Sequence, residues 1–403
     1  MAIRYIFAVS ICALAAPLSA QERLTLDDTA RLAIERAPFV AHHRANASAA
    51  RERIAPAGKL PDPQLTLGAI NVPVDTFSFD QDDMTMLSVG IRQAIPPRGA
   101  LKERVSRAEA EAGVEDARSE LEQRETRREA RRLWLDIYRA EAEQQELAAI
   151  ADIQGSDARA AEQRYRSASG NLQASLKARQ AAVMARERAL TSRYDIARLR
   201  ASLARLIGDA AMLPLADNLV VPAVPAPSFD PADHPAMRAA RADMDRARAE
   251  TRMARAQFHP GVMLDFSYGF RAERADMVTA QLSVDLPLRR HAIQTPQLHE
   301  KEALTESAIQ AAEDQRLKLV AEYDGARAML DAALARARLI EQERLPLARR
   351  EAESSVAGFA RDQDLVREAR MRYIEAEFDL TTARLDAWRA LADLDYLLGE
   401  DAS

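Results

Sequence analysis

The sequence is poor in cysteine and has no long hydrophobic run beyond the N-terminal stretch that ends at Ala20. The only cysteine, Cys12, lies inside this apolar stretch. A chain cleaved after Ala20 would therefore have no thiol, no disulfide and no thiolate metal site. No later run reaches about eighteen apolar residues, which argues against a conventional membrane-spanning helix. Neither sign of charge dominates, since 56 Lys and Arg stand against 62 Asp and Glu, and this balance argues against nucleic-acid binding.

The N-terminal stretch is typical of a cleavable signal peptide. It has one cation, Arg4, then an apolar core over residues 5–16 and small residues before Gln21. We therefore expect residues 1–20 to be removed and the mature chain to lie outside the cytoplasm. No cysteine occurs at the predicted junction, so a lipid anchor is not expected.

Four short segments alternate apolar and polar residues, and they predict strands over about 63–72, 84–95, 261–271 and 277–288. Successive side chains of a strand point to opposite faces, so each segment has one apolar and one polar face. A soluble sheet packed on a helix has this pattern, and so do transmembrane strands of about 9–11 residues. The apolar positions are Leu65, Leu67, Leu87, Val89, Ile91, Val262, Leu264, Phe266, Tyr268, Leu282, Val284 and Leu286.

The rest of the chain has the composition of long helices. Residues 100–165 are rich in Ala, Glu, Arg and Leu and contain no proline. Some 65 helical residues would extend on the order of 100 Å, which is too long for one compact domain. Turn-forming residues around Gly170 then predict a hairpin and a second helix. For each helix taken singly, a solvated two-helix coiled coil is an alternative.

The same plan occurs twice along the chain. The interval from Pro38 to Pro63 equals the interval from Pro235 to Pro260. We expect a first repeat over 21–212 and a second over 213–403, which begins near a proline-rich linker at about 208–235. The long helical hairpins are expected over about 100–207 and 296–398.

This doubled order resembles the outer membrane efflux protein family, the TolC-type exit ducts. Similar local pieces are Arg164-Tyr165, Ala178-Arg179-Gln180, Gln93-Ala94-Ile95-Pro96, Leu286-Pro287-Leu288 and the Leu-Gly endings of both repeats. The resemblance implies a mainly α fold with a small β part. Three chains, with four strands each, would form a 12-stranded outer-membrane β-barrel. A periplasmic α-helical barrel of long coiled-coil hairpins would continue it.

Elementary physics reaches a related conclusion. Four strands cannot close a barrel, because even eight leave only a packed interior. Open strand edges in lipid would leave backbone groups unpaired, so the missing strands must come from other chains. Three is the number that the resemblance implies, whereas physics alone also allows two or four. The apolar strand positions named above are then expected to face lipid.

The function implied by the resemblance is that of a passive duct in a tripartite efflux system. It would lie in the outer membrane of a Gram-negative bacterium and extend into the periplasm. The expected partners are two further copies, outer-membrane lipid, a periplasmic adaptor and, indirectly, an inner-membrane transporter. No catalytic residue, cofactor or resident metal is expected, and the cargo (metals, drugs or proteins) is left open. The alternative is a periplasmic adaptor or a soluble coiled-coil scaffold without a membrane barrel.

The candidate site residues cluster at the predicted hairpin tips. Asp364 and Glu368 stand one helical turn apart and share a helix face, so three copies would bring their carboxylates near one axis. Such a ring favours cations, although ordinary solvated charges would give the same pattern. Arg361 would latch a closed tip to a neighbouring chain. Gly170 and Gly358 mark the tips expected to dock an adaptor, although a hairpin needs glycine in any case.

Overall fold

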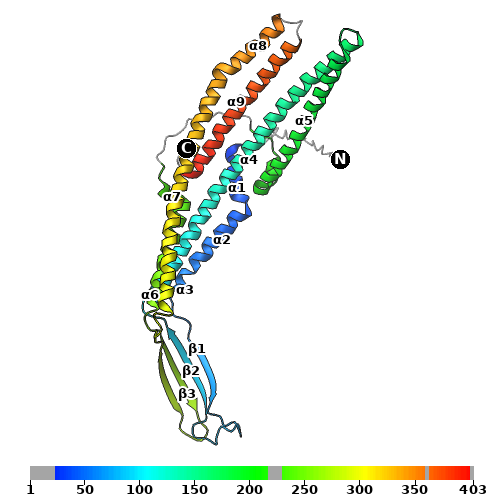
Figure 1. Ribbon diagram of the computed structural model, residues 1–403. Coiled ribbons are helices and arrows are strands. Elements are labelled where there is room, and N and C mark those ends of the chain that lie inside the picture. Colours follow the sequence, from blue (N-terminus) through cyan, green and yellow to red (C-terminus); the bar gives the residue numbers. More distant parts are fainter. Residues whose placement is uncertain (1–22, 217–228, 359–362, 400–403) are drawn as a thin grey trace, which may run out of the picture.

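The computed structural model describes residues 23–216, 229–358 and 363–399 (Figure 1). The predicted signal peptide and Arg361 lie outside these residues, as does part of the proline-rich linker. The molecule is an elongated rod with a sheet at one end and the tips of two helical hairpins at the other (Figure 1).

The helices follow the same order in both halves of the chain. The first half contains α1 (Leu26–Arg36), α2 (Pro38–Glu52), α3 (Ile54–Ala57), α4 (Ala100–Arg166) and α5 (Leu172–Ile207). The second half contains α6 (Pro235–Ala256), α7 (Gln294–Leu339), a π-helical segment (Ile340–Arg344), α8 (Leu345–Gly358) and α9 (Gln363–Leu398). Short 3₁₀ turns at Gly208–Met212 and Pro231–Asp233 lie at the two ends of the linker.

Prolines and caps explain where these helices begin, end and deform. Pro38 stands at the first position of α2, where its missing N–H costs nothing, and α1 ends just before it. Pro346 instead lies inside the long α7–α8 rod, and the π-helical segment directly precedes it. Proline cannot donate to the carbonyl one turn earlier and its ring crowds that group, so the wider turn accommodates it.

The four strands form one antiparallel sheet in the order β1-β2-β3-β4. They span Gln64–Ile70, Met86–Ile95, Val262–Phe270 and Met277–Val284. The last strand ends before the expected residue 288. Asp285 still donates to the carbonyl of Gly261, at 3.0 Å, but Pro287 has no N–H to continue the ladder. Leu286, expected on a strand, therefore lies beyond one.

The hydrophobic core lies in the helical part, with one main cluster in each half. Trp134, Leu203 and Leu206 belong to the first cluster, and the indole Nε1 of Trp134 donates to the carbonyl of Leu24 at 2.9 Å. Leu319 and Leu391, from α7 and α9, belong to the second. The predicted fold class, mainly helical with a small antiparallel sheet, is confirmed.

None of the helices in the described parts of the chain is both long enough and apolar enough to cross a membrane.

Candidate functional site

One face of the sheet is apolar across all four strands. The register places Leu67 beside Val89, Val89 beside Tyr268, and Tyr268 beside Val278, so these side chains share one face. The same register brings together every apolar position singled out from the sequence that lies within a strand. They are Leu65, Leu67, Leu87, Val89, Ile91, Val262, Leu264, Phe266, Tyr268, Leu282 and Val284.

This apolar face is uncovered. Leu67 is 75% exposed, Leu282 62% and Phe266 58%, and among the described residues no helix packs across the sheet (Figure 1). A contiguous exposed face of this kind marks a surface that meets another protein or a membrane. The sheet is therefore not folded against the described helices of its own chain, which was the soluble alternative.

The opposite face of the sheet is largely polar. Arg92 and Asp265 pair directly across β2 and β3, with 2.8 Å between Nε and Oδ2. Asp265 stands beside Gln281 of β4, and Ser267 beside Thr279. A sheet with one apolar and one polar face suits a boundary between an apolar and an aqueous environment.

At the outer end of the sheet, contacts between the strand-connecting loops join the two halves. Arg274 in the β3–β4 loop pairs with Asp83 in the β1–β2 loop, at 2.6 Å. The buried hydroxyl of Thr85 donates to the carbonyl of Asn71 at 2.7 Å. These bonds stabilise the β1–β2 loop and hold it beside the β3–β4 loop.

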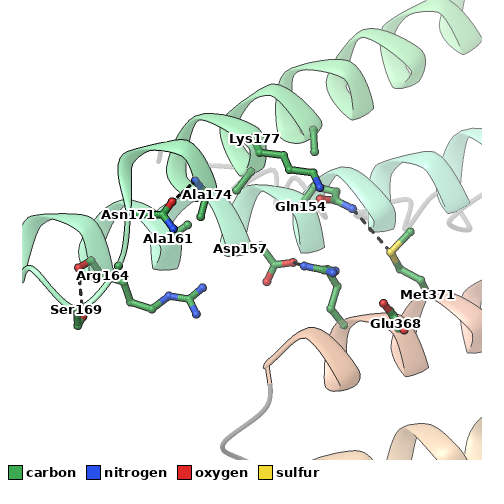
Figure 2. A pocket seen from close by; sticks show the side chains of 14 residues that line it. Gln154, Asp157, Ala161, Arg164, Ser169, Asn171, Ala174, Lys177, Glu368 and Met371 are labelled. Atoms are coloured by element: carbon green, nitrogen blue, oxygen red, sulfur yellow. Dashed lines mark hydrogen bonds and ion pairs between the residues drawn. The ribbon is translucent and has the colours of Figure 1, made fainter.

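At the other end of the rod, a cleft of about 630 Å³ separates the α4–α5 tip from the first turns of α9 (Figure 2). Charged side chains from three helices line it, among them Asp157, Arg164, Lys177, Arg367 and Glu368. The cleft is open to solvent and contains both signs of charge. The arrangement favours electrostatic contact between the hairpins rather than chemistry on a bound molecule.

Two contacts cross this cleft. Arg367 Nη1 of α9 lies 3.6 Å from Asp157 Oδ2 of α4, and Gln154 Nε2 donates to Met371 Sδ over 3.8 Å (Figure 2). No pattern in the sequence singles out these four residues. Their pairing depends on α4 packing against α9, and these two helices belong to different halves of the chain.

The predicted gate residues are placed only in part. Glu368 is exposed, lines the cleft and pairs with Arg372 one turn later, at 3.4 Å. Arg372 also reaches Glu351 of α8, at 2.8 Å, and so ties the two helices of its own hairpin. Asp364 lies in the first turn of α9, but its side chain is outside the described residues, as is the whole of Arg361. The gate formed by these residues stays a prediction.

The α4–α5 tip is closed by backbone bonds. Ser169 N donates to the carbonyl of Arg164 at 2.9 Å, and Ala168 N to that of Tyr165 at 3.1 Å. This pair of bonds is a Schellman motif, and it places Ala168 in the left-handed region with φ of 58°. Gly170 has no such angle, but a Cβ there would lie 3.1 Å from Arg164 Cβ, so its small size matters. At the other tip, Gly358 is the last residue of α8.

A buried histidine connects α6 to α9 near the middle of the rod. His234 caps α6 by accepting the N–H of Ala236 at Nδ1, over 3.2 Å, and its ring meets the edge of Tyr396 on α9. Burial is the main cause that lowers the pKa of His234 to about 4, and Arg124 and Arg128 lower it further. Protonation of His234 below neutral pH is therefore expected to destabilise the folded chain.

Residues 29–209 match the family described as outer membrane efflux protein. A search of curated proteins found no match.

Three solved structures share the fold over most of their length. A membrane protein from Pseudomonas aeruginosa is 16% identical, covers 93% of each chain and has a TM-score of 0.78. The outer membrane protein VceC of Vibrio cholerae is 18% identical, over 93% of this chain and 96% of its own, with a TM-score of 0.73. The MtrE outer membrane channel of Neisseria gonorrhoeae is 18% identical, over 94% and 89%, at 0.70.

The sequence match covers the first repeat, and the shared fold extends over both. At this level of identity the solved structures show the fold alone, and the sequence match indicates the family. The sequence match over residues 29–209 and the shared fold together confirm the resemblance to the outer membrane efflux protein family that the sequence shows.

Proposed function

We propose that three copies of this chain form the outer-membrane channel of a tripartite efflux system. The observation that carries the proposal is the bare apolar face of the sheet, which extends away from every described helix. In water this face would be costly to expose, and burying it stabilises by about 25 cal/mol per Å². Lipid is the occupant that a protein of this family would meet there.

Closure of the sheet follows from its two free edges. In the order β1-β2-β3-β4, the outer edges of β1 and β4 have no strand partner among the described residues. If β4 of one copy pairs with β1 of the next, three copies close a twelve-stranded barrel and satisfy every ladder. The face with Arg92 and Asp265 then lines a water-filled lumen, and the apolar face meets lipid.

The helices continue this barrel into the periplasm, and the hairpin tips are its entrance. We place the gate at Arg361, Asp364 and Glu368, and the adaptor docking points at the tips around Gly170 and Gly358. The adaptor would connect the channel to an inner-membrane transporter. Heavy-metal cations and drugs are both candidate cargoes. The family is one of passive channels, so the chain acts as a conduit and not as an enzyme.

Two substitutions on neighbouring residues of β4 test the proposal. Leu282→Arg places a cation on the apolar face, and Gln281→Arg places the same cation on the polar face. An Arg at the lipid midplane costs about 2–4 kcal/mol, whereas a lumen position is tolerated. We expect Leu282→Arg to abolish the heat-modifiable trimer in outer-membrane fractions, and Gln281→Arg to retain it. Equal behaviour of the two variants, or a native monomer in the soluble periplasm, would reject the proposal.

A further inference from the structure

Helices α4 and α9 run antiparallel in one register from the middle of the rod to its tip. Arg139 lies opposite Asp386, at 3.7 Å, and Gln154 lies opposite Met371. The interval between the two positions on α4 equals the interval between the two on α9. Two helical turns toward the tip from Arg139 and from Asp386 stand Glu146 and Asp379. The register therefore places two carboxylates opposite each other.

On both sides of Glu146, charged positions of this seam have partners of the opposite sign. Pairs of Arg with Asp join α4 to α9 there. They are Arg131–Asp395 at 2.6 Å, Arg132–Asp393 at 2.5 Å, Asp136–Arg389, Arg139–Asp386 at 3.7 Å and Asp157–Arg367 at 3.6 Å. Among the described residues, Glu146 forms no such pair.

The surroundings of Glu146 do not supply the missing cation. Glu143 lies one turn earlier on α4, and Glu375 and Asp379 act on Glu146 from α9. Asp379 itself pairs with Arg336 of α7, at 3.5 Å, and with Arg344 of the π-helical segment.

The α5 side of the seam is acidic as well. A cleft between α4 and α5 is lined by Glu143, Glu187, Arg188 and Asp195. Among the described residues that line it, the single cation therefore lies among three carboxylates.

Burial is the largest cause that raises the pKa of Glu146, and the three neighbouring carboxylates add to it, giving about 7. A group whose pKa is raised by packing favours the packed state while it is protonated. Once α9 moves away, Glu146 returns toward the ordinary carboxyl value of about 4.3.

We propose that Glu146 is a proton-sensitive joint in the α4–α9 seam. Neutral Glu146 lets α9 pack against α4. Ionised Glu146 repels Asp379 and Glu375 and weakens the seam, so the α8–α9 tip separates from the α4–α5 tip. Beyond the joint, the cleft contacts at Gln154 and Asp157 hold the described part of the seam. The effect of this movement on conduction rests on the proposed channel function, whereas the movement itself does not.

The direction of the pH effect follows from the two protonation states. Between the ordinary carboxyl pKa and about 7, the packed seam holds a proton that the separated seam has lost. Raising the pH through this range therefore increases the separated population, which levels off above about 7. Acidification closes the tips.

Distances between spin labels on the two tips test this joint. Cysteines replace the exposed residues Gln173 of α5 and Arg350 of α8, and Cys12 becomes Ser. Labelled chain is diluted into unlabelled chain, so that pulsed electron resonance reads the distance within one copy. We expect this distance to lengthen and its distribution to broaden between about pH 5 and about pH 8.

Variants of Glu146 test whether its ionisation causes the change in distance. Glu146→Gln keeps the size of the side chain and is neutral at every pH, so its distance stays short throughout. Glu146→Met serves the same purpose if the Gln variant folds poorly. The control Glu162→Gln removes a carboxylate that pairs with Arg166 within α4. In this control the distance between the labels should lengthen with pH as it does in the native chain.

A native distance that does not change with pH overturns the proposal. The proposal is also overturned if the distance between the labels lengthens with pH in the Glu146→Gln variant as it does in the native chain. Neither readout needs a conducting channel. A failure of conduction alongside a normal pH response would reject the proposed function and leave the joint intact.

Discussion

Asp157 of α4 and Arg367 of α9 form an ion pair across the cleft, with 3.6 Å between Oδ2 and Nη1. Both side chains are more than two-thirds buried, so solvent screens the pair less than most pairs on this surface. Among the described residues it is the charged α4–α9 contact nearest the tips. We therefore expect this pair to oppose separation of the two hairpin tips.

Asp157→Asn should loosen the tips. The substitution keeps the size of the side chain and removes its charge, at a cost on the order of 1 kcal/mol, or roughly a fivefold shift toward the separated state. In planar bilayers we expect a higher resting conductance. The effects of Asp157→Asn and Arg367→Gln should be less than additive, because both substitutions remove this pair. A conductance that stays native, or rises equally in Glu162→Gln, would contradict this role.

Ala168→Gly should stabilise the α4–α5 tip. Ala168 has φ of 58°, a conformation that glycine adopts without strain and alanine does not. We expect a gain of about 1 kcal/mol in the free energy of unfolding, measured by urea denaturation in detergent. The control is Ala201→Gly on the exposed face of α5, where the same substitution should cost about 1 kcal/mol. If both substitutions lower the free energy of unfolding, the left-handed φ of Ala168 does not destabilise the tip.

Acidification should weaken the middle of the rod through His234. The folded pKa of His234 is lowered to about 4, whereas in the unfolded chain it has its ordinary value near 6.5. The unfolded chain therefore takes up a proton first, and stability present above pH 6.5 is lost as the pH falls toward 4.

His234→Asn isolates this contribution. Asparagine is a good helix N-cap, so it can replace the bond to Ala236 N, but it does not titrate. The difference in unfolding free energy between native chain and variant should change by about 2–3 kcal/mol from about pH 7 to about pH 4. The expectation fails if the two chains lose stability in parallel.

Much of the sheet could be predicted from the sequence. Alternation alone identified four strands and assigned their apolar residues to one side, because a period of two leaves no other arrangement. The pairing of β2 with β3 could not be read in this way, since Val89 and Tyr268 are distant in the chain and many registers keep the same faces. Leu286 was placed wrongly because Pro287 ends the ladder early.

The tips were harder to predict. Glycine at position 170 suggested a turn there, but the structure assigns the left-handed angle to Ala168, which carries no sequence signal for it. Asp157, Gln154 and Met371 sit in helical stretches that resemble their neighbours in composition. Only the packing of α4 on α9 gives these residues a role, and helical periodicity does not specify which helices meet.

Within the described parts of the chain, the buried hydrophobic clusters lie among the helices, while the sheet contributes to none of them. In the proposed assembly, a newly exported chain would consolidate its helical rod in water, whereas its strands would gain a stable form only with sister chains and lipid. In this assembly the helices would fold in water first, and the strands would fold later in lipid. The unassembled chain would be the species that needs a holdase and the one most exposed to degradation.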